Sequence, residues 1–379
     1  MERGKSKDTI KQSLRKLKPG LIDAYIIKKF IGTFFFSLAL IMGIAVIFDF
    51  AEKLDEFIQK NAPVRAIIFD YYLNFIPYFA TLFAPMFVFI TVIFFTSKMA
   101  YNTEIIAILN SGMSFRRMMY PYFISAAFIA LFTFSLTNFV IPHSNIVRLD
   151  FEAKYWRDPG FRRISINSIH RQVYPNVYVY MGSYNSRTRQ GNNFTIEKYD
   201  DHGKLLSKLS AKTVRWDTVS NKWGAWNYSI RNIDSLTETI TTGRRIDTTL
   251  TIRPADFGRT PEFVGTMTYG ELKKYVRLLR MQGSDELKLY LNEYHRRFAN
   301  PYAIFILTLI GVSLSSKKIR GGIGMQIGLG LLLSFSYILF QQFSSQFSLK
   351  GSLSPLLAMW IPNIIFTIIA FVLYRLAPK

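Results

Sequence analysis

The chain has 379 residues and a formal net charge of +22, and half of its residues are hydrophobic. In a soluble domain apolar residues recur with a period of about 2 or 3.6 residues, whereas here they form long runs without charge. The composition therefore excludes an ordinary soluble protein. The absence of cysteine excludes a disulfide framework, a cysteine-ligated metal or iron–sulfur centre and a thiol nucleophile.

Several runs free of Asp, Glu, Lys and Arg approach or exceed the roughly 20 residues that a helix needs to cross a bilayer. These runs cover residues 30–48, 71–97, 118–147, 298–316, 321–349 and 351–374. A lone spanning segment must satisfy its own backbone hydrogen bonds, so we expect six transmembrane helices. An even number of spans places both termini on the same side of the membrane.

The basic residues predict which side that is. Lys and Arg gather in the first 29 residues, in the turns after the second and fourth spans, and at the C-terminus. Because short loops rich in Lys and Arg stay in the cytoplasm, both termini and both turns are expected there. The first span is too long for a cleaved signal peptide, and we expect it to remain as an anchor. The basic N-terminus is attributed to topology and to attraction by anionic headgroups.

The long polar insert between the third and fourth spans reads as strands. Alternating or β-branched segments are expected to form strands at 177–180, 193–199, 212–216, 223–233 and 248–252, with turns at 201–203 and 220–222. Such spacing is typical of a β-sandwich, a jelly roll or an open β-groove. The insert is basic, which suits an anionic amphiphile, although a solvated, positively charged surface explains the charge equally well.

The apolar period changes to that of a helix just before the fourth span. Residues 269–281 are expected to form this helix, and Gly283 is its predicted C-cap. The predicted fold class is an α-helical integral membrane protein with six transmembrane helices and an inserted periplasmic all-β, jellyroll-like domain. The expected domains are residues 1–142, with the first three spans, residues 143–265, with the β-domain, and residues 266–379, with the connecting helix and the last three spans.

The turn between the second and third spans is the candidate site of energy coupling. The chain has no phosphate-binding loop, so it cannot hold ATP phosphates itself; if it transports and the transport is powered, the power must come from a partner at the cytoplasmic face. A short helix is expected over about residues 102–112, capped by Asn102 or Thr103 and ended by Gly112. Glu104 in its first turn either pairs with a basic group of an ATPase partner or only complements the helix dipole. The apolar face predicted beside it consists of Ile105, Ile106 and Leu109.

Other candidate residues lie in or near the spans. Gly324 and Gly328 form a G-x-x-x-G in the fifth span, which favours close helix packing, either within the chain or at a gate seam with a partner. The lipid-binding candidates are Lys53, Arg148, Lys154, Phe34 and Phe335. Interfacial snorkelling of the cations and contact of the rings with bulk lipid are the simpler alternatives.

Several segments resemble one known family. These are residues 21–30, 102–114, 140–142, 267–272 and 295–301, in an order of three spans, a β-domain and three spans. The chain resembles the lipopolysaccharide-export permeases LptF and LptG over nearly its whole length, and its opening segment is closer to the LptG half of the family. Asp49 stands where relatives carry basic residues, so no phosphate-binding role is transferred to the first span.

The resemblance implies partners and a mechanism. Members of the family form an LptF–LptG heterodimer on a homodimer of the ATPase LptB. The assembly extracts lipopolysaccharide from the inner membrane and passes it through LptC to the bridge protein LptA. Glu104 then corresponds to the coupling-helix glutamate, and the first and fifth spans line lateral gates.

The expected function is therefore that of a permease subunit of an ABC-type lipopolysaccharide exporter. It needs no cofactor, no metal and no nucleic acid, and it is not itself an enzyme. The alternative is a membrane-anchored periplasmic glycolipid-binding or sensing protein without transport activity. An integral-membrane enzyme is disfavoured, because the spans hold no paired carboxylates and no histidine cluster.

Overall fold

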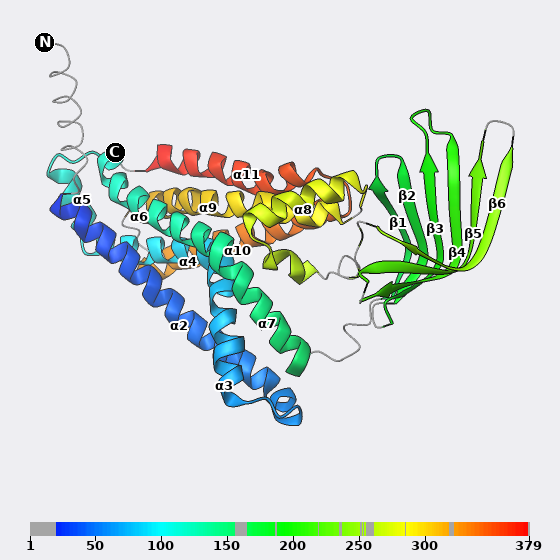
Figure 1. The fold of residues 1–379 in the computed structure, drawn as a ribbon. Coiled ribbons are helices and arrows are strands. Elements are labelled where there is room, and N and C mark those ends of the chain that lie inside the picture. Colours follow the sequence, from blue (N-terminus) through cyan, green and yellow to red (C-terminus); the bar gives the residue numbers. More distant parts are fainter. Residues whose placement is uncertain are drawn as a thin grey trace, which may run out of the picture. The chain divides into compact units, whose positions relative to one another are not determined.

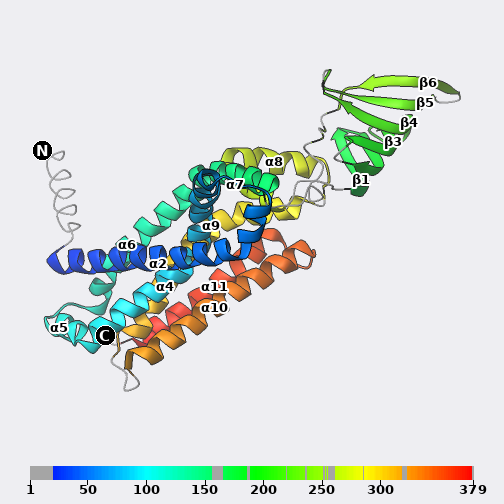
Figure 2. The ribbon, with the colours of Figure 1, turned by 90° about the horizontal axis from the view of Figure 1, so that it is seen from below.

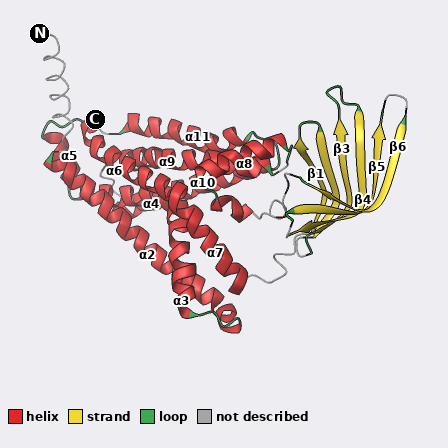
Figure 3. Ribbon diagram, viewed as in Figure 1, coloured by secondary structure: helices red, strands yellow, loops and turns green. Residues whose placement is uncertain are grey.

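The computed structural model describes residues 20–155, 165–185, 188–218, 220–234, 237–250, 252, 254, 261–284, 286–317 and 322–377. The basic segment before residue 20, with Lys318, Arg320 and Lys379, lies outside these residues. The chain forms two compact units. The first consists of Met1–Asp49, Ile76–Val140 and His295–Lys379, and the second of Phe50–Phe75 and Ile141–Tyr294. Figure 3 colours the helices red and the strands yellow; all the described strands belong to the second unit.

The expectation of six spanning helices is confirmed for the described residues, among which six helical spans are long and apolar enough to cross a membrane. These spans cover Leu21–Gln59, Val64–Tyr101, Phe115–Tyr155, Leu287–Ser315, Gly324–Leu349 and Pro355–Leu376. The first and the last three are the helices α2 (Leu21–Gln59), α9 (Leu287–Ser315), α10 (Gly322–Leu349) and α11 (Pro355–Leu376). They are drawn in Figure 1.

The second and third spans contain segments of wider helical pitch. The second runs through α3 (Val64–Ala66), the π-helix η1 (Ile67–Tyr72) and α4 (Leu73–Tyr101), and the third through α6 (Phe115–Ser135), the π-helix η2 (Leu136–Val140) and α7 (Ile141–Tyr155). Both π-helices lie at or near the boundaries of the two compact units. The short helix α5 (Glu104–Asn110) lies between the two spans.

The first helix is longer than the charge-free run that predicted it, because it continues through charged residues at its end. Lys53 and Asp55, for example, belong to α2. A search for uncharged runs measures only the part of a helix that suits the hydrocarbon core of the bilayer. The helix itself ends later, at Gln59.

Aromatic rings hold the first three spans together in the first unit. The ring of Phe30 in α2 lies 5.6 Å from that of Phe95 in α4, and Phe95 stacks on Tyr122 in α6 at 5.4 Å. All three belong to one cluster of buried side chains. Offset and tilted ring pairs of this kind add specific geometry to the apolar contact.

The second unit contains a six-stranded antiparallel sheet in which each strand pairs with the next along the chain. Figure 2 shows the strands following one another in order. The strands are β1 (Ser165–Tyr174), β2 (Val177–Asn185), β3 (Gln190–Tyr199), β4 (Leu205–Asp217), β5 (Lys222–Ile233) and β6 (Glu238–Thr248).

All six strands bend together (Figure 1), and the pairing shows where. One residue of each strand from β2 to β6 is passed over in the ladder. We call this line the bend row; it consists of Gly182, Asn193, Lys212, Asn227 and Arg244. Asn193 and Asn227 have φ of 51°, which asparagine tolerates better than most residues.

Along each strand, side chains point alternately to the two faces of the sheet, and this alternation shifts by one residue at the bend row. Met181 and Phe194 on one side of the row, and Val214, Trp223 and Ala225 on the other, therefore reach the same cluster of buried side chains. The bend thus folds one face of the single sheet onto itself, and this face carries the core of the sheet.

The structure confirms four of the five expected strands and corrects the fifth. Of the residues expected to form a strand at 248–252, Thr248 ends β6, residues 249, 250 and 252 lie outside any strand, and residue 251 is outside the described residues. The backbone oxygen of Ile252 accepts a hydrogen bond of 2.8 Å from the Trp223 indole. Strands β1 and β6 were not predicted. In β6 most side chains are exposed and none is buried, so the strand lacks the apolar alternation that the prediction requires.

The helix expected before the fourth span is confirmed as α8 (Tyr269–Met281), with Leu272, Val276 and Leu279 buried. It begins with a capping box in which Thr268 and Glu271 bond each other's backbone N–H groups. It ends before Gly283, whose φ of +60° allows the chain to turn there.

Candidate functional site

The short helix α5 ends as the sequence predicts and begins differently. Gly112, at φ +85°, follows its last turn, and its N–H donates to the Leu109 carbonyl. Thr103 precedes the helix at φ 61° and makes no side-chain cap; its hydroxyl donates instead to the carbonyl of Asn102 at 2.6 Å. A threonine in the left-handed region is unusual, so the turn that leads into α5 is held in a strained conformation.

The carboxylate of Glu104 contacts the first spanning helix of the same chain. Its Oε2 accepts hydrogen bonds from the Tyr25 hydroxyl at 2.9 Å and from the Lys29 ammonium at 3.4 Å, both on α2. Partial burial would raise the pKa of Glu104, but the hydrogen bonds from Tyr25 and Asn102 and the charge of Lys29 outweigh it and lower the pKa. Glu104 is therefore a charged group with partners inside its own chain.

The predicted apolar face of α5 is divided between the core and the surface. Ile105 is 1% exposed and belongs to the buried cluster around Phe115 and Met118, so its side chain is covered by the chain itself. Leu109 is partly buried against the same cluster, whereas Ile106 is 46% exposed. Ile106 is thus the residue of the three that presents most apolar surface.

A second contact, which no sequence pattern predicted, joins the start of α2 to the start of α6. The guanidinium of Arg117 donates to both carboxylate oxygens of Asp23, at 2.7 and 2.6 Å. Asp23 also accepts the backbone N–H of Gly20 at 2.8 Å, and its side chain is 1% exposed. Such a two-bond pairing is the strongest geometry available to these groups.

The two glycines of α10 face away from the rest of the described chain. A Cβ atom built on Gly324 or Gly328 would meet nothing within 4 Å, whereas one built on Gly330 would strike Ile93. Only 22% of the most apolar stretch of α10 and 17% of that of α2 is buried, against 61% for the second and fourth spans. The glycines therefore do not serve as packing sites within the described chain.

Two of the three lipid-binding cations are buried inside the second unit. Lys53 is 6% exposed and donates to the Tyr71 hydroxyl, and Arg148 is 8% exposed and pairs with Glu152 at 3.6 Å. Lys154 is exposed, with its ammonium 4.9 Å from the ring centre of Tyr155.

The two phenylalanine candidates also differ in accessibility. Phe34 is fully buried in the cluster shared by the first three spans. Phe335 on α10 is 62% exposed. Of the five lipid-binding candidates, Lys154 and Phe335 are thus the accessible ones in this conformation.

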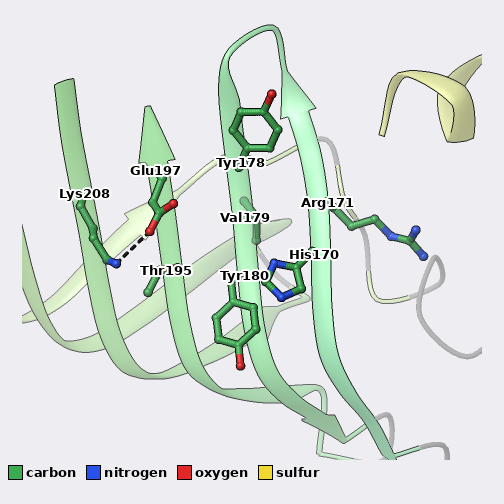
Figure 4. A pocket seen from close by; sticks show the side chains of 8 residues that line it. All are labelled: His170, Arg171, Tyr178, Val179, Tyr180, Thr195, Glu197 and Lys208. Atoms are coloured by element: carbon green, nitrogen blue, oxygen red, sulfur yellow. Dashed lines mark ion pairs between the residues drawn. The ribbon is translucent and has the colours of Figure 1, made fainter. Parts of the chain in front are cut away.

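The sheet carries a depression of about 420 Å³ on the face opposite its core (Figure 4). It is lined by His170, Arg171, Tyr178, Val179, Tyr180, Thr195, Glu197 and Lys208. The cations at its edge pair with carboxylates: Lys208 lies 2.8 Å from Glu197, and Arg171 lies 3.5 Å from Glu286. The hydrogen bond from Lys208 lowers the pKa of Glu197.

These pairings reduce the positive charge that the depression offers to an anion. Within the residues that the structure describes, no group of three or more His, Asp and Glu side chains could hold a metal ion. The depression is therefore lined mainly by polar and aromatic side chains, and its lysine and its arginine are already paired with carboxylates.

Comparison with known proteins gives a consistent result. The family model for the lipopolysaccharide export system permease LptF/LptG matches residues 24–376. The lipopolysaccharide export system permease protein LptG of Haemophilus influenzae (strain ATCC 51907 / DSM 11121 / KW20 / Rd) is 21% identical over 357 residues, which are 92% of this chain and 96% of the relative. With its six apolar helices and its inserted antiparallel sheet, the chain belongs to the LptF/LptG family of permeases of the lipopolysaccharide export system, multi-pass membrane proteins that are transporter subunits and not enzymes.

Proposed function

We propose that this chain is one permease of an ABC-type exporter that extracts lipopolysaccharide from the bacterial inner membrane. Both termini and α5 face the cytoplasm, and the bent sheet lies in the periplasm. The match of residues 24–376 to the permease family carries the proposal, and the six apolar helices support it. The second subunit of the pair is the other member of LptF and LptG.

ATP is hydrolysed by a separate homodimer of LptB, which docks at α5. Glu104, Ile105, Ile106, Leu109 and Gly112 form the coupling site. The exposed side chain of Ile106 supplies an apolar contact, and the Glu104 carboxylate, 30% exposed, supplies a charge for a basic group of the ATPase. Gly112 ends the helix and lets the chain turn back into α6.

The partner permease packs on α10 along Gly324 and Gly328, which form part of a lateral gate. This assignment is supported by the empty space over both glycines and by the small buried share of α10. Small residues at a helix surface allow a neighbouring backbone to approach closely in a membrane. The other poorly buried span, α2, borders the same gate.

Lipid enters through the gate and leaves along the sheet. Phe335 and Lys154 are accessible to a lipid in this conformation, whereas Phe34, Lys53 and Arg148 contact lipid only after the helices around them separate. Lipopolysaccharide then passes to LptC and to the bridge protein LptA. A ligand can drive such a change only through its different affinity for the two conformations.

The second candidate function is glycolipid binding or sensing without transport, and the depression on the sheet favours it. A sensor would bind glycolipid without an ATPase and without a second permease. Co-purification of the chain with both, and lipid release that depends on ATP, distinguish the permease from the sensor.

The experiment reconstitutes the chain with its ATPase and partner permease and measures ATP-driven release of lipopolysaccharide to an acceptor. Glu104→Ala is expected to lower the release about tenfold, the equivalent of roughly 1.4 kcal/mol, while membrane insertion persists. Glu52→Ala, which removes an exposed acid at the other end of α2, serves as the control. Native release in Glu104→Ala contradicts the coupling role, and no release by the native complex contradicts the permease function.

A further inference from the structure

Two contacts tie the first spanning helix to the segment α5–α6, and they differ in the burial of the carboxylate. Arg117 donates two hydrogen bonds to Asp23; the Asp23 side chain is 1% exposed and the Arg117 side chain is 43% exposed. Glu104 takes single hydrogen bonds from Tyr25 and Lys29, and the Glu104 and Lys29 side chains are 30% and 34% exposed. All five residues belong to the first compact unit.

The contact between Asp23 and Arg117 is costly to break. Breaking it would leave the buried carboxylate of Asp23 without its counter-charge, and an unpaired buried charge is costly. The backbone N–H of Gly20 gives the same carboxylate a third hydrogen bond. The start of α2 is therefore fixed to the start of α6 as long as the unit is folded.

The contacts of the Glu104 carboxylate with Tyr25 and Lys29 are weak enough for other partners to replace them. A single ion pair whose side chains are 34% and 30% exposed is screened by water and contributes little free energy. The distance from Lys29 Nζ to Glu104 Oε2 is 3.4 Å, long for a charge-assisted bond. A better-placed cation can therefore replace Lys29 and Tyr25 on the carboxylate.

The packing of α2 matches a pivot at its first turns. Its buried residues in this part form one stripe, Asp23, Ile26, Phe30 and Phe34. From residue 35 to residue 49 only Met42 is buried. The beginning of the helix is thus anchored in the first unit, whereas residues 35–49 have fewer buried contacts there; Lys53 and Phe57, closer to its end, are buried in the second unit.

We propose that Asp23 and Arg117 are a permanent pivot of the first helix, and that the bonds of Tyr25 and Lys29 to Glu104 are a latch that docking of the ATPase opens. A cation of the ATPase binds the Glu104 carboxylate in place of Tyr25 and Lys29, and α5 is then no longer bonded to α2. The helix α2 then turns about its pivot. This inference rests on the proposed permease function.

The pivot is tested with the reconstituted complex by the number of lipopolysaccharide molecules released per ATP hydrolysed. Arg117→Gln is expected to lower this ratio about tenfold, because an uncompensated buried charge displaces the helix. Arg116→Gln removes the same charge from the exposed neighbouring position and is expected to keep the native ratio. A loss of folded protein alone lowers both rates and leaves the ratio unchanged.

Arg117→Lys completes the test of the pivot. Lysine keeps the charge but cannot form the two-bond fork, so we expect a ratio between those of the native chain and Arg117→Gln. Equal ratios for Arg116→Gln and Arg117→Gln overturn the pivot; where Arg117→Gln does not assemble, a native ratio for Arg117→Lys overturns it. Absence of release by the native complex would contradict the permease function itself. This outcome differs from failure of the pivot, in which the native complex releases lipopolysaccharide and the Arg117 variants do so with the native ratio.

The latch is tested by the affinity of the detergent-solubilised permease pair for the purified ATPase. Lys29→Gln combined with Tyr25→Phe is expected to strengthen this affinity about threefold or more, because docking no longer competes with the latch. Lys28→Gln, at the exposed adjacent position of α2, is the control and is expected to bind as the native chain does. Unchanged or weaker binding of the double variant overturns the latch.

Discussion

Several hydroxyl side chains in the spanning helices donate hydrogen bonds to carbonyl groups of their own helix. Thr133, Thr308 and Ser334 each donate to the carbonyl four residues earlier, at 2.7–2.9 Å. In hydrocarbon an unsatisfied hydroxyl is costly, and this local bond removes the cost without a partner from another helix. The polar residues that do join helices, such as Asp23 and Arg117, are therefore set apart by their long-range bonds.

The sequence identified single site residues better than the contacts between them. Glu104 and Gly112 are recognisable from their place in a short helix, because a first-turn acid and a final glycine are local signals. Tyr25 and Lys29 lie 79 and 75 positions from Glu104, and Asp23 lies 94 from Arg117. No local pattern encodes such pairs, since they arise only when the helices pack.

At the residue scale, we predict that Tyr184→Phe reduces the loss of stability of the sheet in alkali. Tyr184 is 1% exposed beside Trp223, and burial raises its pKa to about 12. Below about pH 10 neither the folded nor the unfolded state is ionised, so the stability is unaffected. Between about pH 10 and 12 the unfolded state alone loses this proton, and stability falls by on the order of 2 kcal/mol.

The measurement is the unfolding of the full chain, followed by the circular dichroism of the sheet, from pH 9 to pH 12. The native chain and Tyr178→Phe, which alters a tyrosine that is 44% exposed, should lose stability in parallel. Tyr184→Phe should lose less. The same slope in all three proteins would contradict a buried neutral phenol at position 184.

At the scale of the elements, helices were predicted more reliably than strands. The agreement for α8 follows from two concordant signals, an apolar stripe and a glycine just after its end, and the structure adds a capping box at its start. Strand β6 has no such signals, because it is an edge strand with exposed side chains, and backbone pairing with β5 defines it instead. Backbone pairing does not depend on apolar periodicity, so a search for that periodicity does not detect such a strand.

Also at this scale, we predict that two glycine-to-alanine changes, one in α9 and one in α10, differ in their effect on the stability of the chain. Gly311→Ala on α9 is expected to destabilise the chain by about 1–3 kcal/mol, because the new Cβ would lie 2.8 Å from Val92 and 3.2 Å from Phe89. Gly328→Ala on α10 meets no atom within 4 Å, so the stability of the single chain should not fall.

Thermal unfolding of both variants in detergent measures the first effect, and co-purification with the partner permease measures the second. Gly328→Ala should weaken co-purification if α10 forms the seam between permeases. A loss of thermal stability in Gly328→Ala as large as that in Gly311→Ala would refute the free surface on α10.

At the scale of the whole molecule, contacts group the chain differently from the order of its spans. The segments Phe50–Phe75 and Ile141–Tyr155 belong to the same unit as the sheet, although they are the continuations of spanning helices. Boundaries near residues 142 and 265 were expected because the composition changes there, and they remain a prediction. Composition reports where a segment stops being apolar, whereas contacts report which segments fold together.

We predict the orientation of the molecule to be testable with single cysteines, since the native chain has none. In spheroplasts a membrane-impermeant maleimide should label Lys204→Cys, in a turn of the sheet, and should reach Ser111→Cys, after α5, only once the membrane is lysed. The cysteine-free chain is the control for background labelling. Labelling of Ser111→Cys in intact spheroplasts would invert the topology and rule out docking of an ATPase at α5.

The bend row has a consequence for anything that lengthens the sheet. The outermost strands in the described order are β1 and β6, so further strands can be added only along these two margins. An incoming strand must carry its own extra residue opposite the row, because a slip of one position would turn its apolar side chains outward. The bend row therefore fixes the register in which a neighbouring sheet can pair with β1 or β6. A sheet with a matching bend can pair along the whole margin, whereas a flat sheet cannot.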